Sequence, residues 1–145
     1  MTKPLRVCSL YPELMNIYAD RGNLLLLQRR CEWRGIGFEL LASDLGDGPR
    51  VLAGFENHGG RTHLGAGATP LGRVLKGHGN DGQSGFEGVR HGNVIGTYLH
   101  GPLLPKNAWF ADWLIRQATG LDRLEPLDDA LEDAAHAEAR RAAGI

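Results

Sequence analysis

The sequence contains few cysteines, no long apolar run and almost no net charge. The two cysteines, Cys8 and Cys31, form no Cys-x-x-Cys pair, which argues against a disulfide scaffold or a zinc ribbon. No run approaches the 18 apolar residues of a membrane span, and no apolar leader follows Met1. The chain has 16 Lys and Arg against 17 Asp and Glu, without a basic stripe for nucleic acid. We therefore expect one cytoplasmic domain with no membrane insertion.

Glycine, in contrast, is abundant. It accounts for 21 of the 145 residues, and most of these lie between residues 54 and 101, which predicts tight turns and short strands there. The chain before residue 54 has a different pattern. An apolar run at 5–10, a helical pattern over 12–35 and a second apolar run at 38–42 predict a parallel strand pair with a right-handed crossover.

From Arg50 onward the pattern becomes dense in short strands. We predict strands at 51–55, 62–64, 72–75, 85–90 and 93–99, with a hairpin tip at 91–93. Two helices are predicted to follow, an amphipathic one over 106–118 that ends at Gly120 and an Ala-rich one over 128–143. The whole chain, 1–145, is thus expected to form a single α/β domain with a mixed sheet flanked by helices.

His100 is the first candidate for chemistry. It ends a predicted strand and precedes Gly101 and Pro102, a placement that gives an imidazole both fixity and access. A general base needs a fixed tautomer, a cleft and a reachable proton. The alternative is a histidine that caps a strand and satisfies a carbonyl, and the pattern alone favours this role. If His100 is a base, we expect it to be partly exposed, to face a cleft and to lie near residues 56–58.

Glu56, Asn57 and His58 form a polar cluster ahead of Gly59 and Gly60. A buried carboxylate could orient a histidine, as the acids of nucleophile–base pairs do. The favoured alternative is a polar loop whose glycines adopt positive φ. The spacing of the remaining histidines matches no metal-binding motif, so no metal or other cofactor is expected.

No residue stands out as a nucleophile. Cys31 lies inside the helical run 28–34, where cysteines usually pack in the core, although nearby arginines could lower its pKa. Cys8 lies within the first predicted strand and is expected in the core. A candidate base without a nucleophile is the main puzzle that the sequence poses.

Four segments in order resemble one family. They read LYPELMNIYADRGN over 10–23, GFENHGGRT over 54–62, GTYLHG over 96–101 and LPKN over 104–107. Together they resemble the CobB/CobQ-like class I glutamine amidotransferases, and more narrowly the glutaminase subunit (GatD) of lipid II isoglutaminyl synthase. The resemblance implies a flavodoxin-like sheet, an elbow cysteine that attacks the side-chain amide of glutamine, and His100 as base and acid.

The resemblance also implies a reaction and a partner. Ammonia from glutamine would pass to a Mur-ligase-like, ATP-dependent subunit (MurT), which amidates the D-glutamate α-carboxylate of lipid II in peptidoglycan synthesis. Two alternatives stay open, a partner-binding module without activity and a cobyric-acid-synthase-type domain in cobalamin biosynthesis. The string FENHGGRT favours the cell-wall version over the cobalamin version.

The chain departs from this family between about residues 44 and 51. There the family has the middle of its sheet, with a Gly-Gly-Gly oxyanion turn, the nucleophile elbow and a substrate-binding arginine. All three are absent, through a natural deletion, an engineered one or an omission from the sequence. The glutamate that class I relatives have two residues after the histidine is replaced by Pro102, as in this subfamily, where the partner is thought to contribute the acid.

Overall fold

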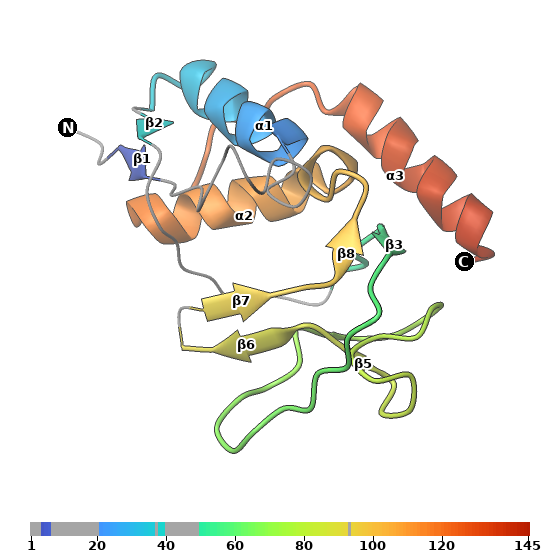
Figure 1. Cartoon of the computed structure of the whole chain (residues 1–145). Helices are drawn as coiled ribbons and strands as arrows, with labels where there is room; N and C mark the ends of the chain where they lie inside the picture. The colour runs from blue at the N-terminus through green and yellow to red at the C-terminus, as the bar shows by residue number, and fades with distance from the viewer. Residues whose placement is uncertain (1–3, 7–20, 37, 40–49, 93) are drawn as a thin grey trace.

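The computed structural model describes residues 4–6, 21–36, 38–39, 50–92 and 94–145 (Figure 1). In chain order the elements are β1 (Leu5–Arg6), α1 (Arg21–Glu32), β2 (Phe38–Glu39), β3 (Phe55–Glu56), β4 (Gly72–Arg73), β5 (Phe86–Glu87), β6 (Val89–His91), β7 (Val94–Gly96), β8 (Leu99–His100), the 3-10 turn η1 (Leu104–Lys106), α2 (Ala108–Thr119) and α3 (Ala130–Ala143). The helices gather in one half of the molecule and the hairpins in the other, with β3 and β8 between them (Figure 1).

The opening strand pair is parallel, which confirms the βαβ prediction. β1 pairs with β2 so that Leu5 lies opposite Phe38, and α1 connects the two strands. The rest of the two predicted runs, residues 7–10 and 40–42, lies outside the described residues, as does the 12–20 part of the predicted helix. The helix ends as predicted, because the chain leaves α1 through a turn in which Gly35 has a φ of 63°.

The three pairings described after residue 50 are antiparallel, again as predicted. Phe55 lies opposite His100, Gly72 opposite Glu87 and Val89 opposite Gly96. The expected hairpin tip is present between β6 and β7, where Gly92 has a φ of 56°. The fold class is therefore α/β, with small two-stranded sheets in the part of the chain that is described.

Four strand predictions need correction. Residues 51–54 form no ladder, because the amide of Asn107 occupies both backbone groups of Ala53. Residues 62–64 are not a strand, since the N–H of Thr62 donates to the Asn80 carbonyl in a loop. The run 85–90 is divided at Gly88, between β5 and β6. The run 93–99 is divided at residues 97–98, so that β7 pairs with β6 whereas β8 pairs with β3.

The two C-terminal helices confirm their predictions within two residues. α2 ends at Gly120, whose φ of 72° and N–H bond to the Arg116 carbonyl form a left-handed C-cap. α3 ends in the same way at Gly144. Among the described residues, no helix has the length and apolar character that a membrane crossing requires.

The core lies where α1, β1 and α2 meet. Its buried side chains are Leu5, Leu27, Cys31, Ile36, Leu103, Leu104, Phe110, Ala111, Trp113 and Ile115. Burying one large aliphatic or aromatic side chain stabilises a fold by about 1.5–3 kcal/mol. The segment just before α2 therefore anchors the strand half to the helices.

A buried arginine links the three helices. Arg30 of α1 has no exposed surface, and its Nε lies 2.5 Å from Oδ1 of Asp112 on α2. Its two terminal nitrogens bond the carboxylate of Asp129 at the start of α3. Burial opposes the charge on Arg30, but the hydrogen bonds to Asp129 and Asp112 outweigh it and raise the pKa above its ordinary value.

We predict that Asp129→Ala lowers the free energy of unfolding by about 3 kcal/mol. The substitution leaves the buried Arg30 cation with one carboxylate partner, and uncompensated buried charge is strongly destabilising. Urea denaturation measures the change. Asp122→Ala, at an exposed aspartate in the connection between α2 and α3, should change stability by less than about 0.5 kcal/mol. Equal losses in both variants would contradict this account of the cluster.

Candidate functional site

The β3–β8 pair brings the two motif segments together. His100 is half-buried at the end of β8, opposite Phe55, and the two ring centroids are 6.1 Å apart. Gly101 follows with a φ of 111°, and a Cβ there would lie 2.6 Å from the Phe55 ring. The chain can therefore leave β8 beside Phe55 only with glycine at this position. His100 occupies the strand end that the sequence predicts, and its role as a base stays a prediction.

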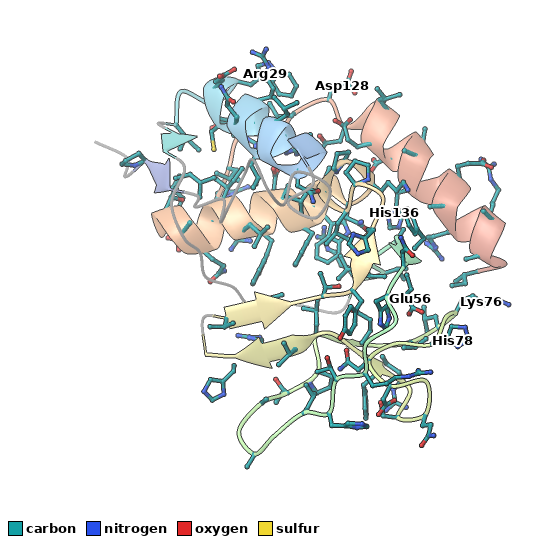
Figure 2. The ribbon with its side chains drawn as sticks, viewed as in Figure 1. Arg29, Glu56, Lys76, His78, Asp128 and His136 are labelled. Atoms are coloured by element: carbon teal, nitrogen blue, oxygen red, sulfur yellow. The ribbon has the colours of Figure 1, made fainter. Side chains whose placement is uncertain are left out.

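Glu56 holds a turn. Its two carboxylate oxygens accept hydrogen bonds from the backbone N–H groups of His78 and Gly79, at 2.8 and 2.7 Å (Figure 2). The turn approaches closely because Gly77 has no side chain, since a Cβ there would lie 2.8 Å from Oε1 of Glu56. In the described structure the carboxylate thus positions backbone amides, which fits the loop alternative better than the orientation of a histidine.

His58 packs against Tyr98 in the same loop. Its ring stacks on Tyr98 with centroids 3.6 Å apart and an interplanar angle of 6°, while its Nδ1 donates to the Gly60 carbonyl. The hydroxyl of Tyr98 in turn lies 2.7 Å from Oγ1 of Thr62. Asn57 is exposed. This cluster attaches the 54–62 segment to the residues just before β8.

The expectation that Gly59 and Gly60 adopt positive φ is wrong. Gly59 and Gly60 are absent from the residues with positive φ. A Cβ at Gly59 would meet no atom within 4 Å, and one at Gly60 would lie 3.5 Å from the Tyr98 hydroxyl. Neither position therefore requires glycine for its backbone conformation.

Glu87 is a buried carboxylate that the sequence pattern does not predict. It is 7% exposed and accepts hydrogen bonds from the Tyr98 N–H at 2.8 Å and from the Thr97 hydroxyl at 2.9 Å. Burial raises the pKa of Glu87 above its ordinary value of 4.5, against the opposing effect of these hydrogen bonds. Its only sequence signal is an acidic residue within a short strand flanked by Gly85 and Gly88.

A cavity of about 550 Å³ lies beside β3 and β8, and both Glu56 and Glu87 line it. Leu99 also lines this cavity, whereas its neighbour His100 does not. Successive side chains of a strand point to opposite faces, so the cavity lies on the face away from the imidazole. The expectation that His100 faces a cleft therefore gains no support from this cavity.

Cys31 is fully buried in α1, and burial raises the pKa of its thiol to about 11. A thiol that is protonated at neutral pH and closed to solvent is a packing residue, as its helical position predicts. Cys8 lies outside the described residues. Within the described part of the chain, no group of three or more metal-binding side chains converges.

Comparison with known proteins defines a class for the strand-rich segment. Residues 45–108 match the CobB/CobQ-like glutamine amidotransferase domain. This segment contains β3, His100 and the first residue of α2. The resemblance that the motifs indicate is thereby confirmed.

Individual relatives show which members of this class the chain resembles. The chain is 49% identical over 68 residues to the lipid II isoglutaminyl synthase (glutamine-hydrolyzing) subunit GatD of Staphylococcus aureus, covering 47% of this chain and 27% of the relative. It is 49% identical over 65 residues to GatD of Streptococcus pneumoniae, covering 45% and 25%. A probable cobyric acid synthase of Methanothermobacter thermautotrophicus is 43% identical over 82 residues, covering 54% and 16%. The matches thus span about a quarter or less of these relatives' lengths.

We predict that Glu87→Gln is more stable than the wild-type chain at neutral pH and that this advantage shrinks as the pH falls. The raised pKa means that folded Glu87 binds a proton at a higher pH than unfolded Glu87. As the pH falls toward 4.5, folded Glu87 takes up a proton before unfolded Glu87 does, which raises the free energy of unfolding of the wild-type chain. The glutamine variant has no such proton to bind, so its advantage shrinks. Glutamine keeps an acceptor for the Tyr98 N–H.

Urea denaturation at neutral pH and at about pH 5 measures this difference. Glu125→Gln, at an exposed glutamate, is the matched control and should show no comparable pH dependence. A stability difference for Glu87→Gln that is the same at both pH values would contradict the prediction.

Proposed function

We propose that this chain is a form of the glutaminase subunit of lipid II isoglutaminyl synthase, with His100 at the position of the catalytic base. The observation that carries the proposal is the 49% identity to two such subunits. Geometry supports it as well, because β3 and β8 pair and thereby join the 54–62 and 96–101 motifs beside one imidazole. In the complete fold, the central strands would join β1–β2 and β3–β8 into one flavodoxin-like sheet.

The proposed chemistry moves one proton back and forth through His100. The imidazole accepts the proton of the elbow cysteine, and the thiolate attacks the amide carbon of glutamine. The protonated imidazole then gives its proton to the leaving nitrogen, which departs as ammonia and leaves a thioester. Water hydrolyses the thioester to glutamate, with the imidazole again taking and returning a proton.

The chain as it stands lacks most of this machinery. The nucleophile elbow and the oxyanion turn fall in the segment absent between about residues 44 and 51, and Cys31 is buried. Catalytic groups that act together lose nearly all of their rate when the nucleophile is removed. Each lost oxyanion donor costs a further factor of about 10² to 10³. The glutaminase activity therefore requires the central segment.

The proposal includes a cytoplasmic heterodimer. The relatives are named as subunits, and the resemblance points to a Mur-ligase-like, ATP-dependent partner (MurT) that receives the ammonia for peptidoglycan synthesis. Pro102 stands where class I relatives have the third catalytic acid, so the partner would supply that acid. Phe55 beside His100 is 53% exposed, which is suited to burial at such an interface.

The second candidate is a partner-binding module without activity. The burial of Cys31 favours this candidate. Its thiol is closed to solvent and protonated at neutral pH, so it cannot serve as the nucleophile for His100 within the described residues. A cobyric-acid-synthase-type function ranks behind both, since the identity to that relative is 43% rather than 49%.

We predict that the chain alone releases no ammonia from glutamine above background. A chimera that carries the central segment of the Staphylococcus aureus relative between residues 44 and 51 should release it. In that chimera, His100→Ala should lower the rate by about 10² to 10⁴, the usual contribution of a general acid–base group. A coupled glutamate dehydrogenase assay measures the ammonia.

His91→Ala in the same chimera is the matched control. His91 is exposed at the end of β6, and among the described residues its ring bonds the Gly67 carbonyl alone, so the rate should stay within about twofold. Circular dichroism establishes that each variant is folded. Equal rates for the His100→Ala chimera and the unmodified chimera would contradict the proposal, as would ammonia release by the chain alone that Cys31→Ala abolishes.

A further inference from the structure

A small pocket lies between η1, the start of α2 and α3. Its volume is about 280 Å³, and it is lined by Arg50, Val51, Lys106, Asn107, Ala108, Trp109, Asp133, His136 and Arg140. The three residues from α3 are spaced by three and four, so they share one face of the helix. His136 fixes this face against η1, because its Nδ1 donates to the Lys106 carbonyl at 2.8 Å.

The pocket concentrates positive charge in a chain whose net charge is −1. Arg50, Lys106 and Arg140 line it, against the single carboxylate of Asp133. None of these three cations has an ion pair with another described residue. The Nε of Arg140 is buried and has no acceptor within the described part of the chain. An unpaired buried donor is costly, so an acceptor from outside the chain would stabilise this arrangement.

The start of α2 contributes further donors. Asn107 occupies the N-cap position, but its side chain makes no capping hydrogen bond. Its amide instead bonds the backbone of Ala53 and the Leu103 carbonyl. The first N–H groups of the twelve-residue α2, those of Ala108 and Trp109, are therefore left without the usual side-chain acceptor beside the same pocket.

The charge of the lining side chains indicates the charge of a ligand that would fit. With three cations and one carboxylate, the pocket has an excess of two positive charges, which matches the charge of a phosphate group near neutral pH.

We propose that the pocket between η1, α2 and α3 binds a phosphate group, either free phosphate or the phosphate of a small phosphorylated molecule. Guanidinium groups such as those of Arg50 and Arg140 match phosphate oxygens in pairs, and Lys106 adds a third cation. The α2 N-terminus places N–H groups and a positive dipole end at the same point. A volume of about 280 Å³ limits the ligand to a small molecule.

The pocket borders the candidate site, since Lys106 lines it and the Lys106 Nζ lies 5.9 Å from the centroid of the Phe55 ring, but the proposal does not rest on the proposed glutaminase function. The α3 residues lie outside the segment 45–108 that matches the amidotransferase domain, so the pocket combines that segment with a helix that follows it. His100 does not line the pocket, and phosphate binding requires neither the central segment nor a nucleophile.

Titration of the full chain at constant ionic strength tests the proposal. Inorganic phosphate and glycerol phosphate are added separately, and the amide resonances of Ala108 and Trp109 are followed by two-dimensional NMR. We expect saturable shifts of both resonances. Equal affinity for the two ligands assigns recognition to the phosphate group alone, and tighter binding of glycerol phosphate assigns part of it to the attached group.

Lys106→Gln and Arg140→Gln should each weaken binding by about tenfold or more, because each removes a charged hydrogen-bond donor. Arg141→Gln is the matched control. Arg141 is the exposed neighbour on α3, paired with Glu138, and its loss should change the affinity by less than about twofold. Two variants are used so that either one decides if the other fails to fold.

The absence of saturable shifts with both ligands would overturn the proposal. So would an equal loss of affinity in Arg140→Gln and Arg141→Gln, because that result would indicate general attraction to a basic helix rather than a defined pocket.

Discussion

The described structure depends most on the buried amide of Asn107. With 1% exposure, this side chain bonds the N–H and carbonyl of Ala53 and the carbonyl of Leu103 at once. It thereby fixes the chain just before β3 to the segment between β8 and α2. A buried amide that lost these partners would leave several polar groups unsatisfied at once, which the low dielectric of the interior makes costly. Because the Asn107 side chain makes these bonds, it does not cap α2, and the first N–H groups of the helix have no side-chain acceptor from Asn107.

The helical half is organised by charge as well as by apolar burial. Arg30 of α1 and Arg34 in the turn after α1 share Asp112, and Arg30 also bonds Asp129 ahead of α3. Because the guanidinium of Arg30 is fully buried, its carboxylate partners must stay in place in the folded state. This constraint sets where α3 begins, and His136 then attaches the middle of the helix to η1. The pocket beside η1 follows from these two attachments.

The elements that the sequence predicted well are those set by local patterns. The apolar spacing of α2 and the glycine that ends it are both local, and the parallel β1–β2 pair follows from one βαβ unit. The errors arise where side chains compete with a ladder for backbone groups, as Asn107 does at Ala53. The buried position of Glu87 was not predicted because its hydrogen-bond partners, Thr97 and Tyr98, lie ten and eleven residues further along the chain. Such pairings depend on tertiary contacts that periodicity does not encode.

Within the candidate site, the polar motif residues divide into those that build the loop and one that remains available. Glu56 and His58 are occupied by a turn and by Tyr98, whereas the ring of His100 makes no hydrogen bond to the described residues. An imidazole without a partner has neither a fixed tautomer nor a fixed orientation, and a general base needs both. With proline in place of an acid at position 102, the described residues do not supply that partner. In the proposed glutaminase, the group that orients His100 would therefore come from the partner subunit or from a part of the chain outside the described residues.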